Sequence, residues 1–194
     1  MKNQYETKRL SLIRSEPGLA LEVCNYYLRN KAFFEENDSI QSNFFFTVEY
    51  HKKSLIMDQE KFEKLLGVRF WIKHREYNKL IGMVALNEVV LGAFQSAFLS
   101  FKLDKDELNQ GYMTEAVAAI VKVAFKELNL HRLEANIMPS NYASMRVVEK
   151  LEFYKEGIGK DYLYINGVWE DHIHMVLLNA NWLPTRTVPV SHID

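Results

Sequence analysis

LSFKLDKDELNQGYMTE, residues 99–115, passes from an alternating apolar and polar pattern through a polar loop into the start of a helix. After Gly111 come Tyr112, Met113 and Thr114, whose backbone N–H groups find no acceptor within the first turn of a helix. These amides and the positive end of the helix dipole suit a diphosphate, and Gly111 allows a ligand close to the backbone. The stretch is neither a P-loop nor a dinucleotide fingerprint. Because many such turns bind nothing, a phosphate site can be predicted here only with support from the neighbouring sequence.

The sequence on both sides of this stretch predicts alternating strands and helices. Val117, Val121 and Ala124 fall on one stripe of the clearest helical pattern. Apolar periodicity and turn residues predict the other helices and strands. The expected order is strand 9–14, helices 19–34 and 50–66, strands 68–74, 79–90 and 94–103 in an antiparallel meander, helix 112–128, strand 131–137, helix 141–151 and a hairpin around 166–167. This is an α/β (α+β) chain with a mixed sheet of about seven strands flanked by about four helices.

Length and composition exclude several classes of protein. The chain has 194 residues, of which 48% are hydrophobic, and few glycines or prolines, so we expect one ordered domain over residues 1–182 and a C-terminal tail over 183–194. A net charge of -1 gives no electrostatic footprint for direct nucleic-acid binding. The single cysteine, Cys24, cannot form an internal disulfide and is expected in the core. No signal peptide or membrane-spanning run is visible, which predicts a cytoplasmic protein.

Several motifs in the second half of the chain resemble those of one family. NQGYMTEA at 109–116, MPSN at 138–141, NYAS at 141–144 and LEF at 151–153 are similar to the acetyl-CoA half of the GNAT superfamily. TKRLSLIR at 7–14 and NGVWED at 166–171 resemble its RimJ/RimL-like branch. The resemblance implies a GNAT fold and an acetyl-CoA-dependent N-acetyltransferase. The branch acetylates protein N-termini such as those of ribosomal proteins, although some relatives use small amines.

The resemblance also implies which residues hold acetyl-CoA. The pyrophosphate would lie on the loop Asn109, Gln110 and Gly111 and on the helix start Tyr112, Met113 and Thr114. The acyl carbonyl would rest on a backbone N–H of the strand from Phe101 to Leu103, where that strand separates from strand 131–137. Asn141 would contact the pantetheine or phosphate region, and it can also cap its helix.

Two residues depart from the family's loop pattern. Asn109 stands where glycine is usual, and asparagine tolerates the left-handed conformation that such a turn needs. Asp106 stands where Gln or Arg is usual, and its carboxylate is expected to add negative charge near the phosphates.

Direct transfer of an acetyl group to an amine requires a base, an N–H donor and an acid. We expect Glu88, at the end of a strand beside the acceptor site, to be the base, with partial burial raising its pKa; a solvated strand end is the alternative. Ser144 is the expected acid, with Tyr142 and Tyr154 in reserve. The RimL-like branch places a carboxylate at the position that Leu163 occupies here, so another base is needed.

Other interpretations remain at this point. Glu170, His172 and His174 alternate along one strand, but two histidines without a distant third ligand do not predict a metal site. Asp106 and Leu163 leave open a non-catalytic acetyl-CoA sensor or scaffold, and a plain interaction domain is the third possibility. The amine acceptor, and whether the protein is a monomer or a homodimer, are not fixed by the sequence.

Overall fold

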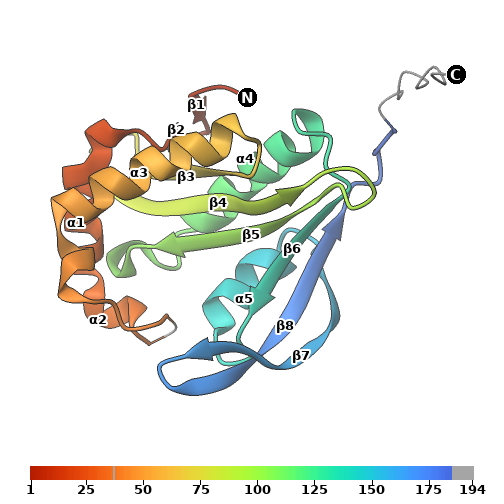
Figure 1. Cartoon of the computed structure of the whole chain (residues 1–194). Helices are drawn as coiled ribbons and strands as arrows, with labels where there is room; N and C mark the ends of the chain where they lie inside the picture. The colour runs from red at the N-terminus through yellow and green to blue at the C-terminus, as the bar shows by residue number, and fades with distance from the viewer. Residues whose placement is uncertain (37, 185–194) are drawn as a thin grey trace, which may run out of the picture.

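The computed structural model describes residues 1–36 and 38–184, and its centre is a mixed β-sheet. The described residues form eight strands in the order β1-β2-β3-β4-β5-β6-β8-β7 (Figure 1). Every neighbouring pair is antiparallel except β5 and β6. The strands are β1 (Gln4–Glu6), β2 (Leu10–Arg14), β3 (Gly67–His74), β4 (Leu80–Val90), β5 (Ser96–Leu103), β6 (Arg132–Ile137), β7 (Tyr154–Ile165) and β8 (Val168–Leu178).

Helices cover both faces of this sheet. The helices are α1 (Ala20–Arg29), α2 (Lys31–Phe34), α3 (Val48–Glu63), α4 (Tyr112–Lys126) and α5 (Tyr142–Glu149), with 3-10 turns η1 (Pro17–Leu19), η2 (Asn43–Phe46) and η3 (Lys105–Glu107). Trp71 and Met83 pack against α1 and α3, whereas their strand neighbours Phe70 and Val84 belong to the core that contains α4. Strand alternation therefore separates an α1/α3 face from an α4/α5 face.

The fold class and the antiparallel meander are confirmed, with two differences. Residues 19–34 are not one helix, because Asn30 leaves the helical conformation (φ -106°, ψ 6°). Its Nδ2 donates to the Tyr26 carbonyl at 2.9 Å, and its Oδ1 accepts from the Lys105 amide at 3.0 Å. The three-residue strand β1 was also not predicted, so the described residues contain eight strands rather than about seven and five α-helices rather than about four.

The sheet divides between β5 and β6. Only Ser96–Phe98 pair with Arg132–Glu134, and beyond this short parallel ladder the two strands diverge (Figure 1). The separation that the family resemblance implied is therefore present. It leaves backbone groups of both strands available in the middle of the sheet.

The remaining sequence expectations concern the core and the chain's end. Cys24 is buried, as expected. Within residues 1–36 and 38–184, no helix has the length and apolar character needed to cross a bilayer. Of the expected tail, 183–194, residues 185–194 lie outside the described residues.

Candidate active site

The loop between β5 and α4 has the conformation that a close backbone ligand requires. Asn109 and Gly111 both have positive φ, 59° and 78°, which confirms that Asn109 can make the left-handed turn. Gly111 is the N-cap of α4, so the amides of Tyr112, Met113 and Thr114 belong to the first helical turn. The loop thus brings several N–H donors to the end of β5.

An ion pair that the sequence did not reveal holds this loop from behind. Arg9 Nε lies 2.7 Å from Glu115 Oε2, and Arg9 Nη1 donates to the Gln110 carbonyl at 2.9 Å. The Arg9 guanidinium also lies 4.4 Å above the Tyr112 ring. Burial alone would raise the pKa of Glu115, but hydrogen bonds from Thr7 and Arg9 hold it below its ordinary value. The carboxylate therefore stays ionised and anchors β2 to the loop.

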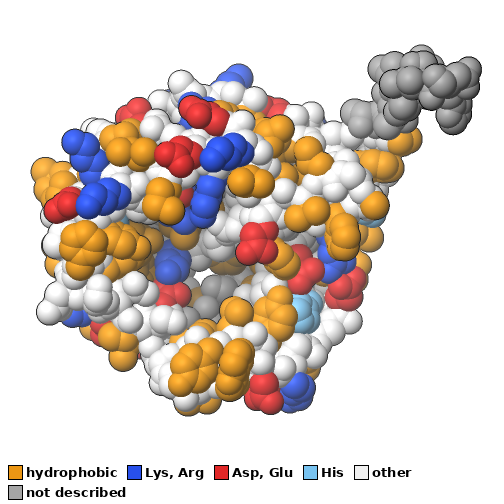
Figure 2. Space-filling view, in the orientation of Figure 1, with side chains coloured by type: hydrophobic (Ala, Val, Ile, Leu, Met, Phe, Trp, Pro, Cys, Tyr) orange, Lys and Arg blue, Asp and Glu red, His pale blue; other side chains and the backbone are white. Residues whose placement is uncertain are grey.

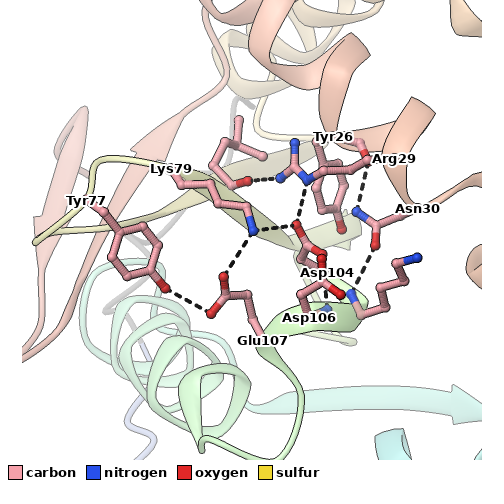
Figure 3. A network of polar contacts seen from close by, with 10 residues as sticks. Tyr26, Arg29, Asn30, Tyr77, Lys79, Asp104, Asp106 and Glu107 are labelled. Atoms are coloured by element: carbon pink, nitrogen blue, oxygen red, sulfur yellow. Dashed lines mark hydrogen bonds and ion pairs between the residues drawn. The ribbon is translucent and has the colours of Figure 1, made fainter.

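A second polar network fixes the start of the same loop (Figure 3). Asp104 is fully buried, and its Oδ2 accepts from Arg29 Nε at 2.6 Å and lies 3.3 Å from Lys79 Nζ. Glu107 accepts from Lys79 at 3.1 Å and from the Tyr77 hydroxyl at 2.9 Å. The network joins the end of α1, the turn between β3 and β4, and η3. It was not predicted, because its members come from distant parts of the sequence.

A pocket of about 400 Å³ opens beside this loop, and most of the predicted cosubstrate residues line it. The predicted residues in its wall are Phe101, Leu103, Asn109, Gly111, Met113, Thr114, Asn141 and Ser144. The wall does not include Gln110 or Tyr112; the carbonyl of Gln110 and the ring of Tyr112 contact Arg9 instead. Asp106 is exposed and does not belong to this wall.

Asn141 and Ser144 meet at the start of α5. Asn141 Oδ1 accepts from the Ser144 amide at 3.1 Å, which caps the helix. The cap uses only the oxygen of Asn141, so its amide nitrogen remains available to a ligand, as expected. Both side chains are half-buried in the pocket wall.

Glu88 lies elsewhere. It sits in the irregularity of β4 between Asn87 and Val90, with a φ of 48°. The side chain is exposed and lines a different hollow, of about 640 Å³, that also contains Asp58 and Arg69. The expected partial burial of Glu88 is therefore wrong, because a bulged residue leaves the strand's alternation. Leu163, at the position of the branch's carboxylate, is 45% exposed.

Comparison with known proteins identifies the family. A model of the acetyltransferase (GNAT) domain matches residues 29–154. The chain belongs to the GNAT family. It is 45% identical to the probable N-acetyltransferase YjcK of Bacillus subtilis over 89% of this chain and 92% of that protein. The crystal structure of ribosomal-protein-S5-alanine acetyltransferase from Vibrio fischeri superposes with a TM-score of 0.90 at 32% identity, covering 94% of this chain and all of that one.

A third comparison concerns the fold. Mycobacterium smegmatis RimJ in complex with CoA-disulfide has the same fold, with a TM-score of 0.83 at 22% identity over 91% of this chain and 84% of that one. The GNAT domain and the similarity to YjcK make this enzyme an acetyl-CoA-dependent N-acetyltransferase.

The residues of the GNAT pocket fit acetyl-CoA. Phe101, Met113 and Val147 provide an apolar wall that suits a pantetheine arm, and Gly111 and Thr114 at the start of α4, where free amides suit a diphosphate, line the same pocket. Arg146 on α5 and Lys150 at its C-terminal cap add two cations to the same wall, and the sequence analysis missed both. The only sequence signal for them was that they lie four residues apart in the predicted helix that begins at Asn141.

Proposed function

We propose that this enzyme transfers the acetyl group of acetyl-CoA to a protein N-terminal α-amine of the ribosomal-protein type. The observation that carries the proposal is the division of the sheet between β5 and β6, directly beside the loop and pocket that suit acetyl-CoA. Similarity over nearly the whole chain to an acetyltransferase of ribosomal protein S5 supports a protein acceptor. Such an acceptor also agrees with the cytoplasmic location expected from the sequence.

In the proposed reaction the amine attacks the thioester carbon directly. A backbone N–H of Phe101 to Leu103 donates to the carbonyl oxygen, where negative charge develops. The nitrogen–carbon bond forms as the carbon–sulfur bond breaks, and the Ser144 hydroxyl supplies a proton to the departing thiolate. Asn141 and the loop from Asn109 to Thr114 hold the cosubstrate. No covalent intermediate on the enzyme is needed.

The experiment is a measurement of CoA release from acetyl-CoA with a panel of acceptors. The panel contains peptides with free N-termini, the same peptides already acetylated at the N-terminus, polyamines and free amino acids. Release with free peptides and not with their acetylated counterparts is the expected result. Release of CoA only with polyamines or free amino acids would mean that small amines are the acceptors. A rise in melting temperature would show that acetyl-CoA binds. If acetyl-CoA binds but no amine causes release of CoA, the protein is a sensor rather than an enzyme.

A further inference from the structure

The pocket beside the cosubstrate loop has walls on both faces of the sheet. Phe101 lines it and packs against the core that contains α4. The next residue, Lys102, is paired with Met83 of the α1/α3 face, and its Nζ lies 5.7 Å from the centre of the Phe34 ring. Beyond Phe98, β5 has no paired strand on its β6 side within the described residues, so the pocket can pass through the sheet. On the α1/α3 face, Figure 2 shows a hollow between the β7–β8 hairpin and the part of the molecule that contains α2.

The two ends of this pocket suit different ligands. The α4/α5 end contains the loop amides and the cations that suit acetyl-CoA. At the α1/α3 end, Phe33 and Phe34 form an apolar wall, and Asp38 and Lys102 add two charges. Asp38 is the one carboxylate among the described residues that line the pocket. Because the cosubstrate enters from the α4 loop, the α1/α3 end is the one left for the amine.

Contacts from both sides of the strand separation hold Asp38. Its Oδ2 accepts a hydrogen bond from Lys102 Nζ on β5. Its backbone carbonyl accepts from Asn166 Nδ2 at 2.9 Å, and the Ile40 amide donates to Asn166 Oδ1 at 2.7 Å. Asn166 lies in the turn between β7 and β8, so Asp38 joins β5 to the hairpin on the other side of the separation (Figure 1). The carboxylate is therefore fixed at the α1/α3 end of the pocket.

The ion pair presents a hydrogen-bond acceptor and a donor side by side. A carboxylate has about four lone-pair sites and an ammonium has three N–H donors, so their mutual bond leaves both able to bind further groups. The first residue of a protein carries the complementary groups, an α-amine and a carbonyl oxygen attached through the same Cα. Its α-amine has an ordinary pKa of about 8, so at neutral pH it arrives mostly as an ammonium. A carboxylate can hold this nitrogen both before and after it loses a proton to solvent.

We propose that Asp38 and Lys102 bind the first residue of the acceptor chain. Asp38 accepts hydrogen bonds from the α-amine, and Lys102 donates one to the adjoining carbonyl oxygen. Lys102 stands between Phe101 and Leu103, the stretch whose backbone would hold the thioester carbonyl, so the pair brings the nitrogen to the acetyl carbon. Asn166 is a positioning residue that acts through Asp38. Polyamines lack the carbonyl, so the pair favours a chain end over them. The proposal rests on the proposed function.

The test measures KM for an acceptor peptide and for acetyl-CoA in the wild type and four variants. Asp38→Asn keeps the shape and removes the charge, Asp38→Glu keeps the carboxylate, and Lys102→Met removes the ammonium. Asp171→Asn is the matched control, because Asp171 also pairs with a lysine, is 32% exposed like Asp38, and does not line the pocket. Calorimetry with the same peptide and each enzyme saturated with CoA gives Kd without turnover.

We expect Asp38→Asn to raise KM and Kd for the peptide by about 10- to 100-fold, because a hydrogen bond between charged groups loses one partner. Lys102→Met should raise both by a smaller factor, because the carbonyl that it binds is neutral. Asp38→Glu should recover part of the affinity. KM for acetyl-CoA should stay unchanged in all variants, and Asp171→Asn should match the wild type.

Three outcomes overturn the proposal while the proposed function stands. The first is a wild-type KM and Kd for the peptide in Asp38→Asn. The second is tighter peptide binding by Lys102→Met, which would mean that Lys102 only competes with the amine for Asp38. The third is an equal rise in KM for both substrates with a lower Tm than the control, which would give the pair a structural role alone. A wild-type enzyme that releases no CoA with any peptide removes the proposed function, and the proposal with it.

Discussion

Asp104→Asn should destabilise the protein and loosen the cosubstrate loop. The substitution keeps the shape and the acceptor for the Asp106 amide at 3.2 Å, but removes the charge that faces Arg29 at 2.6 Å and Lys79 at 3.3 Å. A hydrogen bond to a charged group contributes about 1.5–3 kcal/mol. Because the two cations are 31% and 34% exposed and keep part of their hydration, we expect a loss of about 2–3 kcal/mol in the free energy of unfolding. For a chain of this length that lowers Tm by about 4–12 °C.

The pH dependence of the same variant gives an independent check. Burial favours a higher pKa for Asp104, but hydrogen bonds from Arg29 and the Asp106 amide and the charge of Lys79 lower it below its ordinary value of 3.8. A pKa that is lowered on folding adds stability above the ordinary value, and this stability disappears as the pH falls through the folded value. The difference in Tm between the wild type and Asp104→Asn should therefore be largest near pH 7 and should decrease below about pH 4.

The control is Glu49→Gln, which removes one partner of an ion pair that is 65% and 66% exposed. Because exposed ion pairs contribute little to stability, this variant should unfold like the wild type. Thermal and urea unfolding measure both variants, and KM for acetyl-CoA reports the loop. The reasoning is refuted if Asp104→Asn is as stable as Glu49→Gln at pH 7.

Two further predictions concern glycines. Gly111→Ala and Gly92→Ala both place a side chain at positive φ, 78° and 70°, without a clash, so each should lower stability by about 1–2 kcal/mol. Only Gly111→Ala should weaken acetyl-CoA binding, by about 5- to 30-fold in calorimetry if the loop relaxes by that energy; equal affinities would contradict the loop's role. Gly159→Ala should displace the rings of His174 and Tyr162, because its Cβ would lie 2.8 Å from each, and should lower Tm; an unaltered Tm would contradict this packing.

Much of the fold was visible in the sequence because its signals are local. The meander strands carry apolar alternation, and the first turn of α4 follows a glycine after a polar loop. The individual cosubstrate residues were predicted from the resemblance of this half of the chain to the GNAT family. Asn109 illustrates this, since the tolerance of asparagine for positive φ predicted the observed turn. The break at Asn30 was not visible, because it depends on a bond to the Lys105 amide, which is 75 residues away.

Residues on the acceptor side could not be predicted from sequence, because their positions depend on contacts between distant parts of the chain. Glu88 ends a regular strand in the sequence, but a bulge turns its side chain to solvent. Asp38 and Lys102 are 64 residues apart and meet only because the fold brings Asp38 to β5. No local pattern links the two residues, so their contact could be found only in the folded protein.

The short ladder between β5 and β6 also has a mechanical consequence. Three residue pairs join two half-sheets whose other neighbouring strands are paired over longer stretches, apart from β1 at the edge. Bending stiffness in a sheet comes from its ladder bonds, so the sheet is most compliant along this line. One hydrophobic core nevertheless runs under both half-sheets, since residues of β4, β5, β6 and β8 pack in it together with α4. The join between the half-sheets therefore depends on side-chain packing on the α4/α5 face more than on backbone hydrogen bonds.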